Sequence, residues 1–235
     1  LARVNKYSGQ TSFWNPGCSG TVNAILPAND WIFIAGFYSS IGNQSRENLC
    51  RLSSLDGTPD WNWICDTDDG IYHAEFFNNN IVLGGWFGTV NRQSALDFAV
   101  VDTSTRQVQV GTFSSDGFVR TFTRFGDDFF VSGSFDLINN QFRRRLFDFD
   151  FGDNSPYTWA PSPNAIPESM ICTGPLLYLG GAMTTTGGVY HPYLQVLNVQ
   201  WITPVEEIVQ QENSLSVYPV PASSEIIVSC ENGNS

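Results

Sequence analysis

The sequence predicts an all-β protein, a β-propeller built from four-stranded blades. Four glycines, at positions 36, 85, 133 and 181, are nearly evenly spaced, and each closes a run of mostly large apolar residues. A fixed period in this range is typical of repeat proteins whose units pack against their neighbours. The 21 glycines, 12 prolines and 14% aromatic residues are typical of many short strands joined by turns. Each run is apolar at consecutive positions, which indicates a strand buried on both faces between two other sheets.

The first complete unit illustrates the predicted blade. Asn29-Asp30 is a turn signal before the apolar run, and Asp56-Gly57 is a second turn further on. Equivalent signals precede the other three runs, at 78–80, 126–128 and 174–175. The turns divide the unit into four expected strands, at 21–26, 31–38, 49–55 and 61–65.

The third strand of each unit is predicted from two positions that are always apolar. They follow the repeated glycine at two fixed distances: Leu49, Phe98, Leu146 and Leu194 at the shorter one, then Leu52, Val101, Phe149 and Leu197 at the longer one. The fourth strand is predicted from a tryptophan that follows the second turn, at Trp14, Trp61 and Trp159. We expect this side chain to seal one sheet onto the next, and the unit that carries Val110-Gly111 instead to have a weaker outer edge.

The repeat divides the chain into a partial blade, four blades, a linker and a C-terminal β segment. A solenoid of hairpins is the structural alternative, although β solenoids usually have shorter periods. Residues 1–16 already read as the second half of a repeat, so we expect a fragment of a larger propeller. The predicted boundaries are 1–16, 17–65, 66–113, 114–161 and 162–201 for the blades, 202–213 for the linker, and 214–235 for the last segment.

The repeat resembles the delta-60 repeat family of bacterial propeller-like proteins. The resemblance rests on the segment IFIAGFYSSIGNQSRENLCRLSSLDGTPDWNW and covers roughly residues 1–201. An arginine of the family's loop is present at Arg46, Arg92 and Arg143, whereas the last unit has Tyr190-His191-Pro192 instead. The resemblance implies an extracellular scaffold and no particular reaction.

The end of the chain carries a different signal. A strand, a Pro-x-Pro turn and an alternating strand are predicted from residue 215 onward. This segment resembles the start of the C-terminal sorting domain of the type IX secretion system of Bacteroidota, with Val220 in place of the usual Asn. The resemblance implies export by the secretion machinery and a secreted or outer-surface location, and an ordinary terminal hairpin is the alternative. The residues that match the sorting motif are Val217, Tyr218, Pro219, Pro221 and Ala222.

Charge and hydropathy limit the partners. With 11 basic and 23 acidic residues, the net charge is −12. Such a chain repels phosphate backbones, so we expect no nucleic-acid partner. No apolar run approaches the roughly 20 residues that span a bilayer, so we expect no transmembrane helix.

Residues with catalytic or metal-binding chemistry are few. His73 and His191 lack neighbours at zinc-ligand spacing, and the segment from Asp66 to Gly70 departs from a calcium loop by one residue, so we expect it to be a solvated turn between blades. Arg143 to Arg145 is expected to be a solvated loop rather than an anion site. The five cysteines are an odd number without metal-site spacing, and buried thiols are preferred over a disulfide. We therefore expect no cofactor, no metal and no catalytic residue.

One set of positions remains as a candidate ligand-binding site. Ligands of propellers usually meet the innermost strand or its loops. At one fixed distance before each repeated glycine, this strand carries a polar or amphipathic side chain. These side chains could bind a ligand, or they could form the water-lined wall of a tunnel. These residues are Asn23, Tyr72, Arg120 and Glu168.

The function predicted from the sequence is a non-catalytic scaffold that binds a protein or a glycan. A glycan-active hydrolase or lyase, with its site at the channel mouth, is the first alternative. A structural subunit of a surface assembly is the second. Convergence of two or three Asp, Glu, His or Tyr side chains at the mouth would favour the enzyme.

Overall fold

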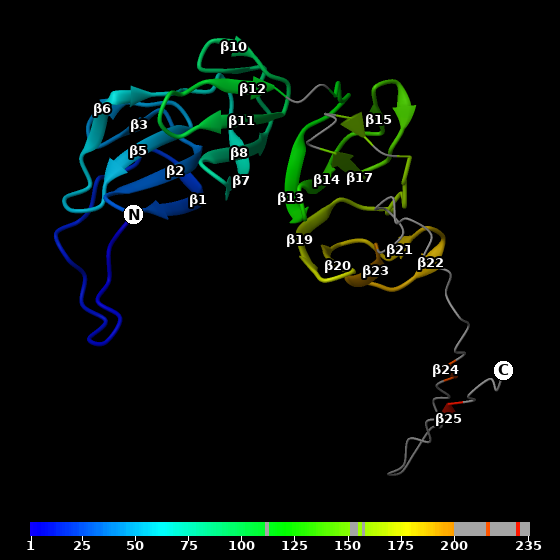
Figure 1. Ribbon diagram of the computed structural model, residues 1–235. Helices are drawn as coiled ribbons and strands as arrows, with labels where there is room; N and C mark the ends of the chain where they lie inside the picture. Colours follow the sequence, from blue (N-terminus) through cyan, green and yellow to red (C-terminus); the bar gives the residue numbers. More distant parts are fainter. Residues whose placement is uncertain (111–112, 151–154, 157, 200–214, 217–228, 231–235) are drawn as a thin grey trace. The chain divides into compact units, whose positions relative to one another are not determined.

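The computed structural model describes residues 1–110, 113–150, 155–156, 158–199, 215–216 and 229–230 (Figure 1). The chain divides into two compact units, Leu1–Ile202 and Thr203–Ser235. The described residues form strands and turns and no helix, so none of them offers a long apolar helix that could cross a membrane. In the second unit, β24 (Leu215–Ser216) pairs antiparallel with β25 (Ser229–Cys230).

The first unit contains four antiparallel sheets that repeat one meander, which confirms the predicted all-β repeat. The first sheet has the order β1 (Thr21–Ala28), β2 (Trp31–Phe37), β5 (Leu49–Ser53) and β6 (Pro59–Ile64). The second has β7 (Ile71–Phe77), β8 (Asn80–Gly85), β11 (Phe98–Asp102) and β12 (Val108–Val110). The third has β13 (Val119–Phe125), β14 (Asp128–Gly133), β17 (Leu146–Asp150) and β18 (Ser155–Pro156). The fourth has three described strands, β19 (Pro167–Thr173), β20 (Leu176–Gly181) and β23 (Leu194–Asn198).

A small hairpin lies between the second and third strands of every sheet, where the sequence predicted only a loop. Each hairpin consists of two very short strands. They are β3 (Ser40–Ile41) with β4 (Gln44–Ser45), β9 (Thr89–Val90) with β10 (Gln93–Ser94), β15 (Leu137–Ile138) with β16 (Gln141–Phe142), and β21 (Thr185–Thr186) with β22 (Val189–Tyr190).

The four sheets follow one another in space in chain order, with their first strands side by side. Figure 1 shows β1, β7, β13 and β19 on the inner side of the series, and β1 contacts β7, β7 contacts β13, and β13 contacts β19. The second strand of the first three sheets is buried on both faces, as predicted, whereas β20 of the fourth sheet alternates between buried and half-buried residues. Phe33 packs into the core shared with the second sheet, whereas its neighbour Ile34 packs into the core formed with the N-terminal segment.

The tryptophan that seals the first sheet onto the second is Trp63, not Trp61 as predicted. The Trp63 side chain is buried, packs edge-on against Phe33 with 5.1 Å between ring centroids, and donates from Nε1 to the backbone oxygen of Thr103 at 2.9 Å. Trp61 is 71% exposed. In a regular strand, residues two apart share a face, but the pairing of β6 with β5 shifts register between Pro59 and Ile64, so the two tryptophans differ in burial. Trp14 is the equivalent of Trp63, since its Nε1 donates to the backbone oxygen of Ser53 at 3.1 Å.

The strand pairing also shows which repeat position Cys18 occupies. Cys18 forms an isolated bridge with Ile41, as Thr67 does with Val90, so Cys18 corresponds to Thr67 and not to Cys65. Among the described side chains, Cys18, Cys50, Cys65 and Cys172 are free thiols. The side chain of Cys230 lies outside the described part of the structure.

A polar side chain at the start of each unit holds the small hairpin of that unit. Asp68 accepts hydrogen bonds through Oδ1 from the backbone N–H groups of Gly88 and Thr89, both at 2.8 Å. Equivalent acceptors are Asp116, Asn164 and Ser19. The acidic segment from Asp66 to Gly70 is therefore a turn between sheets, as predicted. No group of three His, Cys, Asp or Glu side chains within the described ranges is arranged to hold a metal ion.

Candidate ligand-binding site

The four candidate residues occupy the same special position, a β-bulge in the first strand of each sheet. Val22 pairs with Gly36 and Ala24 with Ala35, which leaves Asn23 as the extra residue. The same register shift leaves Tyr72, Arg120 and Glu168 as the extra residues of β7, β13 and β19. A bulge inserts a residue that the neighbouring strand does not pair, and so re-aims its side chain. We call these four residues the bulge row.

The bulge explains why the repeated glycine is required. A Cβ atom on Gly36 would lie less than 3.0 Å from the carbonyl oxygen of Thr21, which the bulge brings against the second strand. Gly85, Gly133 and Gly181 have the same conflict with Gly70, Phe118 and Ile166. Only glycine leaves room for such a close approach of two backbones. The strongest sequence signal of the repeat therefore marks the position that builds the candidate site.

Each member of the bulge row contacts the first strand of an adjacent sheet. Asn23 donates from Nδ2 to the backbone oxygen of Ile71 at 2.7 Å. The guanidinium carbon of Arg120 lies 5.0 Å from the ring centroid of Tyr72, in a cation–π arrangement. Arg120 Nε donates to Glu168 Oε2 at 2.5 Å. The structure thus brings all four predicted residues into one continuous line across β1, β7, β13 and β19.

Two aromatic side chains contact Tyr72, and a third stacks on one of them. Phe37 follows the repeated glycine of the first sheet, and its ring centroid lies 4.9 Å from that of Tyr72. Phe118 lies 5.0 Å from Tyr72 on the other side, and Trp86 stacks on Phe118 at 5.5 Å with an interplanar angle of 23°. We call Phe37, Tyr72, Trp86 and Phe118 the aromatic cluster. Trp86 is 59% exposed and the other three are half-buried, so the cluster presents ring surface to solvent.

Gly70 makes space for the aromatic cluster. A Cβ atom on Gly70 would overlap the ring of Phe37, so the ring rests directly on the backbone of the second sheet. Phe37 and Trp86 both come directly after a repeated glycine, and this shared position is the signal that the sequence offered for them. Their meeting with Phe118 was not predictable, because Phe118 belongs to a third sheet.

A second polar contact lies beside the bulge row on the same strands. Thr121 Oγ1 and His73 Nδ1 are 3.2 Å apart, and the His73 ring packs edge-on against Phe122 with 4.5 Å between centroids. His73 Nε2 lies 4.0 Å from Glu75 Oε2, and both side chains are about one-third exposed. This contact ties β7 to β13, and the Thr121 hydroxyl that faces the histidine is buried, at 3% exposed.

The bulge row and the aromatic cluster combine a few polar groups with flat apolar surface. An amide, a guanidinium and a carboxylate lie beside four aromatic rings along neighbouring strands, and one of these rings is the phenol of Tyr72. Such a mixture of flat apolar surface and a few polar groups is typical of sites that orient a ligand by stacking and hydrogen bonding. Glu168, the carboxylate of the row, is held in the ion pair with Arg120.

The other predicted functional residues cannot be placed. The sorting-motif residues Val217, Tyr218, Pro219, Pro221 and Ala222 lie outside the described residues.

Comparisons with known proteins were made for the whole chain. No protein-family model and no curated protein matches it. Among solved structures, the crystal structure of the computationally designed Ika4 protein is similar, with 12% sequence identity and a TM-score of 0.49. That alignment covers 78% of this chain and 94% of the Ika4 chain.

Proposed function

We propose that the protein is a secreted or cell-surface β-propeller of the delta-60 repeat type that binds a glycan without transforming it. The four repeated sheets would be blades, and their first strands would border the central channel. The observation that carries the proposal is the line of bulged side chains beside the aromatic cluster. A bulge at one position in four successive sheets directs four side chains to one surface.

A glycan is the ligand class that fits this surface best. The C–H groups of a sugar ring carry a partial positive charge and pack on the negative faces of aromatic rings. Trp86 offers an exposed ring face that Phe118 holds in place from behind, at 5.5 Å. Asn23 and Glu168 offer hydrogen-bonding groups for sugar hydroxyls at the two ends of the row. The net charge of −12 favours a neutral glycan over a sulfated or uronic one.

Binding can be tested with a glycan array followed by calorimetry on the best ligand. Trp86→Ala should weaken binding about tenfold or more, because a stacked ring is lost. Trp61→Ala is the matched control, since Trp61 is an exposed tryptophan on the outer strand β6. Equal affinity of Trp86→Ala and the wild-type protein would refute the site. Release of shorter sugars during incubation would instead support the hydrolase or lyase.

Export by the type IX secretion system is part of the same proposal. It is supported by the sequence at Val217, Tyr218, Pro219, Pro221 and Ala222, placed behind a linker. The test is to express the protein in a bacterium that has this system, with Tyr218 and Pro219 replaced by alanine. The variant protein should stay inside the cell. Unchanged appearance in the medium or on the cell surface would refute this route.

A further inference from the structure

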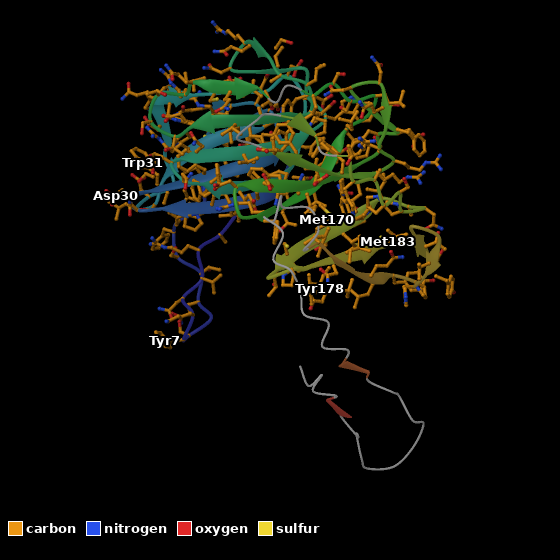
Figure 2. All side chains as sticks on the ribbon, turned by 45° about the vertical axis from the view of Figure 1, so that its right-hand side comes forward. Tyr7, Asp30, Trp31, Met170, Tyr178 and Met183 are labelled. Atoms are coloured by element: carbon orange, nitrogen blue, oxygen red, sulfur yellow. The ribbon has the colours of Figure 1, made fainter. Side chains whose placement is uncertain are left out.

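The fourth sheet has an apolar face that points away from the third sheet. On this face Ile171 is 60% exposed, Leu194 63% and Val196 49%, and Tyr178 is half-buried. Figure 2 shows Tyr178 on the side of this sheet opposite Met170, whose side chain packs into the core shared with the third sheet. We call Ile171, Tyr178, Leu194 and Val196 the tail face.

The positions of the tail face are interface positions in every earlier sheet. The residues equivalent to Leu194 are Leu49, Phe98 and Leu146, and each is at most 1% exposed because the following sheet covers it. The residues equivalent to Tyr178 are at most 2% exposed for the same reason: Phe33, Val82 and Phe130. The tail face therefore has the side-chain pattern of a fourth inter-sheet contact, but no described sheet occupies it.

The first sheet has the complementary feature. Ile25, on β1, is 53% exposed. Its equivalents Ala74, Phe122 and Met170 are 5%, 1% and 9% exposed, and each packs against the preceding sheet. Ile25 therefore occupies a position that contacts the preceding sheet in the other three units. In the first sheet this position is exposed. We call the surface around Ile25 the head face.

The outer part of the same side of the first sheet is already covered. Trp14 is buried against Ile34 and Leu52, and its indole donates to the backbone of Ser53. Trp63 makes the equivalent bond one unit later, from the fourth strand of its sheet. The N-terminal segment therefore supplies the contact of an outer strand, and no inner strand among the described residues covers Ile25 on this side of β1. A sheet with inner strands such as β19, β20 and β23 matches the head face.

We infer that the tail face of one molecule binds the head face of a second copy of this chain. The contact continues the inter-sheet packing that already joins each described sheet to the next within the chain. It joins two different surfaces, so it is heterologous and leads to a ring or to a filament, according to the rotation between copies. The inference depends on the repeat geometry and not on the proposed glycan site.

Sedimentation velocity of the full chain over a wide concentration range tests the inference. The wild-type protein should associate with increasing concentration. Leu194→Glu combined with Val196→Glu, and separately Ile25→Glu, should each raise the dissociation constant at least about tenfold, because a buried carboxylate without a partner is costly. These positions are exposed within one molecule, so thermal unfolding at concentrations where the wild-type protein is monomeric should be unchanged. Leu96→Glu is the matched control, since Leu96 is 51% exposed in the second repeat and belongs to neither face.

Mixing the variants separates head-to-tail binding from other contacts. The Ile25→Glu chain keeps its tail face and the Leu194→Glu/Val196→Glu chain keeps its head face. Their mixture should form a dimer that contains one copy of each and does not grow further. A monomeric wild-type protein at every concentration would overturn the inference, and would indicate that the rest of the chain or another protein covers the tail face. Self-association that persists in Ile25→Glu, or a mixture without the mixed dimer, would overturn it as well.

Discussion

Gly36 and Thr21 constrain one another across the first sheet, because a Cβ atom on Gly36 would lie less than 3.0 Å from the Thr21 carbonyl oxygen. The backbone N–H of Gly36 also donates to the carbonyl of Asn48 at 2.9 Å, so the second strand cannot move away without losing a bond. The same conflict recurs at each repeated glycine. The bulge in the first strand therefore requires a glycine in the second strand at the position opposite it.

Replacing Gly133 should cost much more stability than replacing Gly180, because a Cβ atom on Gly180 would meet no close contact. We expect Gly133→Ala to lower the free energy of unfolding by about 2–4 kcal/mol, because the new Cβ overlaps backbone that side chains fix in place. Gly180→Ala is the control, since its Cβ would have 3.8 Å to the nearest atom, and its effect should stay within about 1 kcal/mol. Urea denaturation measures both. Equal effects of the two substitutions would contradict the bulge explanation.

The two tryptophans of β6 should differ in their contribution to stability. Trp63→Ala removes a buried indole and its bond to Thr103, and we expect a loss of about 3–5 kcal/mol. Trp61→Ala alters an exposed side chain, so we expect a loss below about 1 kcal/mol. Chemical denaturation monitored by circular dichroism avoids the change in fluorescence. A larger loss of stability for Trp61→Ala than for Trp63→Ala would support the prediction from the sequence that Trp61 seals the first sheet onto the second.

A buried aspartate should make the protein less stable at neutral pH than at acidic pH. Asp148 is 1% exposed, and no other described residue donates a hydrogen bond to its carboxylate oxygens. Burial raises the pKa of Asp148 to about 7, the charge of Asp128 adds to the rise, and Arg143 opposes it. The neutral acid is thus preferred in the folded state. As far as Asp148 is concerned, the free energy of unfolding is therefore highest below about pH 4, the usual pKa of an aspartate in the unfolded chain. It then falls by roughly 1.4 kcal/mol per pH unit up to pH 7.

Asp148→Asn tests this pH dependence. Denaturation of the wild-type protein should give a lower free energy of unfolding at pH 8 than at pH 5, and the variant should show a smaller difference. Burial also raises the pKa of Asp128 to about 6, so part of the slope should remain. Asp102→Asn is the control, because hydrogen bonds from Thr105 lower the pKa of Asp102 and its contribution changes only in more acidic solution. A steeper slope in Asp148→Asn would refute the assignment.

The thiols should react in an order set by burial. Burial raises the pKa values of Cys50 and Cys65 to about 12, and both side chains are inaccessible. Because the thiolate is the reactive form, we expect these two residues to resist iodoacetamide at pH 8 in the folded protein. Cys18 and Cys172 are half-buried and should be labelled before Cys50 and Cys65. Mass spectrometry of peptides after timed labelling measures the order, and rapid labelling of Cys65 would contradict the structure.

Much of the fold and of the candidate site was predictable because it repeats along the chain. The period of the glycines indicated the sheets, and consecutive apolar residues such as Phe33 and Ile34 indicated a strand buried on both faces. Asn23, Tyr72, Arg120 and Glu168 were found because a bulge has a fixed distance in sequence from the glycine that accommodates it. These features depend on spacing within one unit, so the sequence carries them directly.

Contacts between units could be assigned only from the folded arrangement. The choice of Trp63 over Trp61 depends on which side chain reaches Thr103 in the next sheet. The aromatic cluster unites Phe37, Tyr72 and Phe118 from three sheets, and Leu194 is exposed although its equivalents in the earlier sheets are buried. The make-up of each sheet follows from the sequence alone. Whether a given face of a sheet is buried depends on the sheet beside it. The sequence does not show this, because a residue such as Leu194 is the same residue whether a neighbouring sheet covers it or not.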